Sequence, residues 1–287
     1  MAGFERPEAT LDELTDRIVA AVEDDERVGP AALLLLLRRY SSGGRPDVAE
    51  TLGIGFAREL EHQERGGFEE DPTAWLAVFG EATAASDDSR LAHAAARLVP
   101  LVCGRWTAPA IDDRMQSIES CLLASAVPEA RAVTAQAVDS IERSVATAYR
   151  PGAGVSHEVP TEPGTPFERG GLADHVCTAS TLVTAYALSG RLPYAMLADE
   201  LMQSVLRQPV DEGASFISRC DAARVQSRLA ALHREPEYRR TAVLPTDTDY
   251  AKHAENALRD LARSVQPRPA DAAPFGLALA EWLGLRA

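Results

Sequence analysis

Helical hairpins recur along this chain, and this repetition constrains its fold more than any other feature. Each copy has a polar or acidic start, an apolar helix, a short break rich in Gly, Ser, Asp or Pro, and a more amphipathic second helix. The apolar helices begin near Pro30, Pro72, Arg114, Asp174, Asp221 and Asp271. The steps between these starts are 42, 42, 60, 47 and 50 residues, which is typical of helical-repeat proteins.

The first helix of several copies is apolar on nearly every face. Residues 32–37 read ALLLLL and residues 177–188 read CTASTLVTAYAL. We expect such helices to be buried on both sides in an inner ring, with the amphipathic second helices outside them. The last helix, residues 271–285, has no successor and is expected to pair with residues 10–24 and close the ring. From the pattern alone, an open solenoid stays an alternative to a closed ring.

The charge of the chain argues against polyanionic partners. The formal net charge is -14 and the pI is near 4.9, whereas binding to nucleic acid or an anionic membrane needs clustered Lys and Arg. The first residues resemble no signal peptide, and no run approaches 18 apolar residues. We therefore expect no nucleic-acid or membrane partner, and a cytoplasmic location.

The cysteines and histidines do not form a metal-binding motif. The four cysteines are widely spaced, without a CxxC pair, so buried free thiols are expected. His175 and Cys177 are two residues apart on a predicted helix, which turns their side chains about 200° away from each other. A metal would need His157 or Cys220 brought in from elsewhere. We expect no metal.

Two segments carry a resemblance to known families. Residues 171–203, GLADHVCTASTLVTAYALSGRLPYAMLADELMQ, resemble the toroid hairpins of six-hairpin glycosidase-like and N-acylglucosamine 2-epimerase-like proteins, and residues 216–240 are similar to the unit that follows. The nearest resemblance is to the helical C-terminal region of thioredoxin-domain proteins of the spermatogenesis-associated type. An acidic helix start, a small-residue turn and an aromatic residue match it at Asp174, Ser189–Gly190 and Tyr194.

The resemblance covers about residues 170–263 and departs from the family in two respects. The thioredoxin-like domain is absent, and Arg219–Cys220–Asp221 stands where an Asn-bearing motif is common. It implies a fold more than a reaction. Together with the repeats, it predicts an all-α, (α/α)6-like toroid of helical hairpins that forms a single domain over residues 1–287.

Acidic residues at the starts of the predicted inner helices are candidates for acid–base chemistry. Asp174 and Asp221 are candidate catalytic carboxylates acting on a sugar, and His175 is a candidate assistant. The alternative is helix capping, for which Asp is a preferred residue. Because Asp71, Asp112 and Asp271 recur at equivalent positions, capping accounts for the whole set economically.

A long connection, residues 150–171, interrupts the repeat. Connections of this length are uncommon within compact domains and are often lids, binding loops or disordered links. His157 and Glu158, at its centre, are candidate ligand-binding residues if the loop folds over the cavity mouth. A flexible surface loop with solvated charges is the equally weighted alternative.

The remaining ligand-binding candidates are Arg219 and Arg224, near the start of the fifth inner helix, and the aromatic Tyr194. An Arg–Asp pair at a helix start and an aromatic at helical spacing are more often structural. No GxGxxG, Walker-type, GxSxG or HExxH motif is visible, so neither a nucleotide cofactor nor serine-hydrolase chemistry is expected.

These observations lead to a functional hypothesis with two rivals. The hypothesis is an enzyme or binding protein that takes a small, carbohydrate-like polar ligand at the cavity mouth, for hydrolysis or epimerisation. One rival is a non-catalytic scaffold for protein partners. The other, an apolar-ligand toroid of the terpenoid-cyclase shape, is disfavoured by the absence of DDxxD and DxDD motifs and by few aromatic residues.

Overall fold

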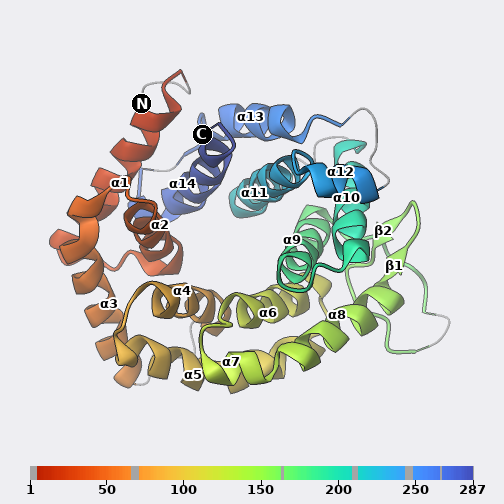
Figure 1. Ribbon diagram of the computed structural model, residues 1–287, viewed down its shortest axis with the longest axis horizontal. Helices are drawn as coiled ribbons and strands as arrows, with labels where there is room; N and C mark the ends of the chain where they lie inside the picture. Colours follow the sequence, from red (N-terminus) through yellow and green to blue (C-terminus); the bar gives the residue numbers. More distant parts are fainter. Residues whose placement is uncertain are drawn as a thin grey trace.

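The computed structural model describes residues 5–65, 71–162, 165–208, 213–242, 248–265 and 267–286. Within them, helices form two concentric rings (Figure 1). The inner ring consists of α2 (Gly29–Ser41), α4 (Pro72–Ala85), α6 (Ile111–Leu123), α9 (Leu172–Ser189), α11 (Phe216–Leu232) and α14 (Pro269–Gly284). The outer ring consists of α1 (Pro7–Glu23), α3 (Ala49–Glu64), α5 (Ser89–Gly104), α8 (Thr134–Ala148), α10 (Leu192–Leu206) and α13 (Tyr250–Leu261).

Short elements complete the described structure. They are the 3-10 turns η1 (Pro46–Val48) and η3 (Arg105–Thr107), the helices α7 (Pro128–Ala132) and α12 (Pro236–Thr241), and an antiparallel pair of two-residue strands, β1 (Tyr149–Arg150) and β2 (Gly154–Val155). The prediction of an almost entirely helical chain is confirmed.

The inner ring is closed, as one of the two sequence alternatives predicts. Each inner helix packs on the next, and α14 packs on α2 and also on α1, the partner predicted for it. Glycines on α4 and α14 allow these helices to pack closely against their neighbours in the ring. A Cβ on Gly80 would lie 2.5 Å from the Ala124 Cα, and one on Gly276 would lie 2.4 Å from a Leu35 methyl carbon. The ring therefore closes by helix contact rather than through a linker.

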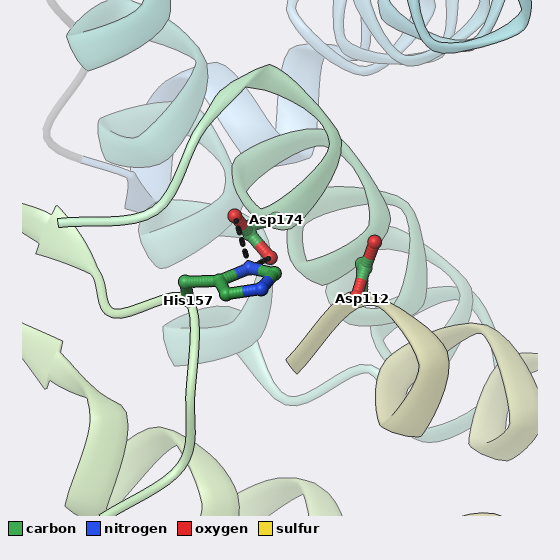
Figure 2. A group of neighbouring side chains, drawn as sticks. All are labelled: Asp112, His157 and Asp174. Carbon is green, nitrogen blue, oxygen red and sulfur yellow. Dashed lines mark hydrogen bonds and ion pairs between the residues drawn. The ribbon is translucent and has the colours of Figure 1, made fainter. Parts of the chain in front are cut away.

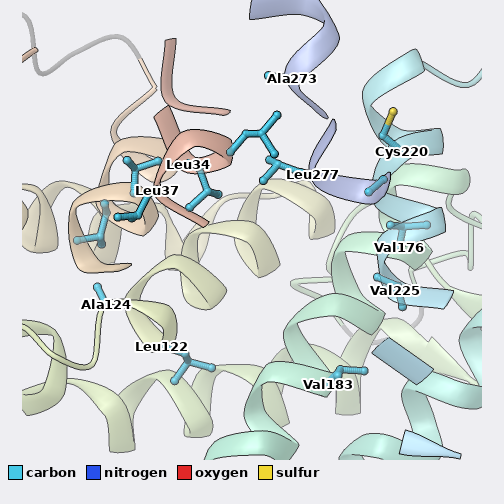
Figure 3. Close-up of a cluster of buried hydrophobic side chains, with 14 of the residues drawn as sticks. Leu34, Leu37, Leu122, Ala124, Val176, Val183, Cys220, Val225, Ala273 and Leu277 are labelled. Atoms are coloured by element: carbon cyan, nitrogen blue, oxygen red, sulfur yellow. The ribbon is translucent and has the colours of Figure 1, made fainter. Parts of the chain in front are cut away.

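Apolar side chains of the inner helices fill much of the ring. Residues 32–37 of α2 are all buried, as expected for a helix covered on both sides. Figure 3 shows Leu34, Val176, Val225 and Leu277, which come from four different inner helices and belong to the buried apolar core. Because each outer helix returns the chain, the inner helices run parallel and begin at one end of the ring.

The predicted caps are partly correct. Asp71 caps α4, its Oδ1 accepting the Ala74 N–H at 3.1 Å. Asp174 lies in the first turn of α9 and accepts the Gly171 N–H at 2.8 Å. The prediction that Asp221 starts α11 is wrong: Ser215 caps that helix, and Asp221 lies in its second turn. The Asp221 carboxylate therefore does not cap the helix.

The described residues of the connection between α8 and α9 are held by main-chain hydrogen bonds. The β1–β2 pair begins it, and isolated bridges join Ala110 to Glu158 and Ser156 to Arg169. The Ile111 N–H donates to the His157 carbonyl at 2.8 Å, and the Gly170 N–H donates to the Val155 carbonyl at 2.9 Å. These bonds fasten the connection to the starts of α6 and α9.

Candidate functional site

A cavity of ≈ 440 Å³ lies inside the inner ring, and all six inner helices contribute to its wall. Its lining includes first-turn residues of several inner helices, such as Pro30, Thr73 and Ala270, so it is reached from the end where those helices begin. Ile217, which also lines it, is 57% exposed. Among the described lining residues none is aromatic. Deeper in the ring the wall becomes charged.

A chain of ion pairs links four helices at this charged part of the wall. Arg38 contacts Glu81 at 2.6 Å and Glu281 at 2.6 Å. Arg224 contacts Glu281 at 3.0 Å and Asp221 at 3.2 Å. Because each arginine holds two carboxylates, the chain of contacts crosses from α4 through α2 and α14 to α11.

A second polar group completes the wall on the side of α6 and α9. Glu119 Oε1 accepts hydrogen bonds from the hydroxyls of Ser180, at 2.7 Å, and Thr184, at 2.6 Å. The Arg228 guanidinium contacts Glu119 at 3.4 Å and donates to the Thr184 hydroxyl at 2.8 Å. Carboxylates and guanidinium groups therefore both face the interior.

The two carboxylates that share Arg224 differ in acidity. Burial raises the pKa of Asp221, and Arg224 opposes that rise only in part. Burial also acts on Glu281, but the attraction of Arg224 and Arg38 outweighs it and lowers the pKa of Glu281 to about 2. Pairs of carboxyl groups with divergent pKa values are typical of acid–base sites. Asp221 is the one that lines the cavity.

Asp112, His157 and Asp174 form a separate cluster (Figure 2). The Nδ1 of His157 lies 3.1 and 3.2 Å from the two carboxylate oxygens of Asp174. One ligand atom from each of the three side chains lies within 4.8 Å of the others. Asp174 is buried, Asp112 is half-buried and the His157 side chain is 56% exposed. Three segments distant in the sequence thus meet at the starts of α6 and α9.

The cluster perturbs the acidity of its members. The hydrogen bond to Asp174 raises the pKa of His157. Burial raises the pKa of Asp174, and the nearby charge of Asp112 adds to this rise, while His157 and the Gly171 N–H oppose it. Burial raises the pKa of the Cys177 thiol, and the charges of nearby carboxylates add to the rise. These carboxylates come from the cavity wall (Asp221 and Glu119) and from the cluster (Asp112 and Asp174), so the two groups lie near each other.

The two carboxylates proposed from the sequence as a catalytic pair have different surroundings. Asp221 and Arg224 line the central cavity, whereas Asp174 is not among its lining residues. No described residue of 150–171 lines it either, so the connection covers the cluster rather than this cavity. Glu158 is exposed and takes part in the bridge to Ala110.

The other candidates lie outside the central cavity. His175 is buried, its Nδ1 lies 2.8 Å from the Gly171 carbonyl oxygen, and burial lowers its pKa. With Arg219, it lines a second cavity of ≈ 370 Å³ between α9, α10, α11 and α13. Tyr194 is buried on α10 and donates its hydroxyl to Glu142 at 2.7 Å.

Sequence reasoning missed several residues that shape both sites. It treated Asp112 only as a cap and overlooked Glu119, Glu281 and Arg38. A signal was present, because Glu119 and Glu281 lie in the second half of their helices, where capping does not account for a carboxylate. Such residues must be paired or face a cavity, since burying an isolated charge is costly.

No protein-family model and no curated protein matches this chain. Among solved structures, it is similar to the GH76A alpha-1,6-mannanase from Salegentibacter sp. HEL1_6, with a TM-score of 0.69 and 11% sequence identity, over 96% of this chain and 100% of that one. The fold is an (α/α)6 toroid. The predicted six-hairpin architecture is thereby confirmed, while the resemblances to particular families stay predictions.

None of the described helices is long and apolar enough to cross a membrane.

Proposed function

We propose that the protein binds a small, carbohydrate-like polar ligand in the central cavity, with Asp221 as the acid or base that acts on it. One observation carries the proposal: a cavity enclosed by all six inner helices contains a carboxyl group whose pKa is raised by burial. Cavities of roughly 300–1,000 Å³ are the usual size for small-molecule sites, and ≈ 440 Å³ falls within that range.

The chemistry of the wall suits a polyhydroxylated ligand. Asp221, Glu81 and Glu119 offer acceptors for hydroxyl groups, and Arg38 and Arg224 offer donors. The apolar rim formed by residues such as Pro30, Pro274 and Ile217 excludes water around a bound ligand.

The reaction class is a further part of the proposal. A carboxyl group with a raised pKa is suited to protonate a leaving oxygen or to exchange a proton with a sugar carbon. Hydrolysis needs a second carboxylate, for which Glu119 and Glu81 are the candidates in the same wall. The similarity of the fold to that of a mannanase supports the carbohydrate class. A cytoplasmic location stays a prediction.

A thermal-shift screen tests the proposal. Neutral sugars, amino sugars and sugar phosphates are added to the wild type, to Asp221→Asn and to the control Asp87→Asn, whose side chain is exposed on the loop before α5. A ligand that binds the native state raises the melting temperature. We expect a hit that is kept in the control and reduced in Asp221→Asn. If no member of the screen stabilises the wild type, the rival hypothesis of a non-catalytic scaffold is favoured.

A further inference from the structure

Asp112, His157 and Asp174 carry donor groups of the types that bind divalent transition metals. An imidazole nitrogen and two carboxylate oxygens, from α6, the connection and α9, lie within 4.8 Å of one another. A mixed set of one nitrogen and two oxygens suits zinc and its neighbours in the first transition series better than calcium or magnesium, which prefer oxygen alone.

The charge of the cluster is not balanced by an arginine or lysine. Within the described part of the chain, Asp174 forms its ion pair with His157, and Asp112 forms none. The helix N-termini beside Asp112 and Asp174 contribute only about half a positive charge each. Two carboxylates held this close therefore attract a cation.

We propose that Asp112, His157 and Asp174 bind one divalent transition-metal ion, with Zn²⁺ as the representative, and leave at least one coordination position open to solvent. This site is independent of a carbohydrate ligand in the central cavity.

The spacing fits such an ion with a small contraction. In a tetrahedral zinc site with bonds of about 2.0–2.1 Å, neighbouring ligand atoms are about 3.3 Å apart. The His157–Asp174 distances of 3.1 and 3.2 Å already match this edge. The other distances between ligand atoms are at most 4.8 Å and must shorten by up to about 1.5 Å. Rotation of the half-buried Asp112 side chain and the exposed His157 side chain supplies this change.

Main-chain hydrogen bonds orient the Asp174 carboxylate and fix the backbone of His157. The Gly171 N–H donates to Asp174 Oδ2 at 2.8 Å and orients that carboxylate. His157 is held on both sides, because its carbonyl accepts from Ile111 and its N–H donates to the Glu168 carbonyl at 3.1 Å. Fixed ligand orientation of this kind strengthens metal binding. A bound ion would join α6, the connection and α9.

The test is a calorimetric titration of tag-free protein, stripped of metal with a chelator, with Zn²⁺, Mn²⁺, Ca²⁺ and Mg²⁺. Metal per chain is also measured by mass spectrometry after dialysis. We expect one Zn²⁺ per chain, with weaker binding of Ca²⁺ and Mg²⁺. His157→Gln and Asp112→Asn should each weaken Zn²⁺ binding by at least about tenfold, because the first removes the imidazole nitrogen and the second removes the charge of a carboxylate ligand.

Matched controls separate this site from adventitious binding. Asp113→Asn changes the exposed neighbour of Asp112 on the same helix, and His253→Gln removes an exposed histidine elsewhere. Both should keep the wild-type affinity. Asp112 and His157 are chosen because neither caps a helix, and circular dichroism checks that both variants fold. The proposal is overturned if wild-type protein retains no zinc, or if both ligand variants bind it as the wild type does.

Discussion

Asp221 and Glu281 both contact the guanidinium of Arg224, at 3.2 and 3.0 Å, yet their pKa values are displaced in opposite directions. Glu281 also contacts Arg38, whereas Asp221 faces the cavity with Arg224 as its one ion-pair partner in the described structure. The two carboxylates therefore have different roles: Glu281 stabilises the ring, and Asp221 is available for a ligand.

Replacing Glu281 with Gln should destabilise the protein at neutral pH. A carboxylate whose pKa is lower in the folded state contributes stability above its unfolded pKa, and that contribution is lost as the pH falls through the folded value. For Glu281, the fall of the pKa from 4.5 to about 2 corresponds to a contribution of at most about 3 kcal/mol to the free energy of unfolding. Urea unfolding of wild type and variant should differ by a constant amount above pH 5. The difference should shrink between pH 4.5 and 2, and a pH-independent difference would contradict this assignment.

Replacing Asp221 with Asn should leave stability unchanged or raise it at pH 7. The pKa of Asp221 is higher in the folded protein than in the unfolded chain, so ionisation above the folded value costs stability, and the amide removes that cost. Arg224 keeps Glu281 as its partner. The melting temperature is the measurement, with Glu281→Gln measured in parallel. A loss equal to that of Glu281→Gln would show that Asp221 is structural.

Two glycines of the β1–β2 hairpin provide a matched pair of substitutions. Gly152 and Gly154 both have positive φ, at 75° and 89°. A Cβ on Gly154 would lie 2.1 Å from His175 Nε2, whereas a Cβ on Gly152 meets nothing within 4 Å. Gly152→Ala should cost about 1–2 kcal/mol of unfolding free energy from backbone strain. Gly154→Ala should cost about 1–3 kcal/mol more, because the methyl group overpacks the site. Equal losses in urea unfolding would contradict the contact with His175.

Helix glycines test how the ring closes. A Cβ on Gly80 would press on the backbone of Ala124, but a Cβ on Gly53 in α3 meets nothing within 4 Å. Gly80→Ala should therefore destabilise the protein, by about 1–3 kcal/mol. Gly53→Ala should stabilise it by about 0.5–1 kcal/mol, because alanine favours the helix. If Gly80→Ala is also stabilising in urea unfolding, α4 and α6 do not approach as closely as described.

The sequence predicts the architecture well because helical periodicity and hairpin breaks are local signals. The apolar run at 32–37 and the Asp71 cap follow from neighbouring residues, and the pairing of the first and last helices follows from the unpaired last helix of the repeat. The cluster does not follow, since His157 meets Asp174 and Asp112 through bridges too short to produce a strand pattern. The position of Asp221 differs from the prediction for a related reason: Ser215 supplies the cap six residues earlier than the apolar pattern suggests.

The most direct test of ligand binding in the central cavity is to fill it. Ala77 lines the cavity on α4, and Ala84 is exposed on the same helix. Saturation-transfer NMR, with the sugar that best stabilises the wild type, compares wild type, Ala77→Phe and Ala84→Phe. The proposal predicts signal transfer to the sugar in wild type and Ala84→Phe, and its loss in a folded Ala77→Phe. Undiminished transfer in Ala77→Phe would contradict binding in this cavity.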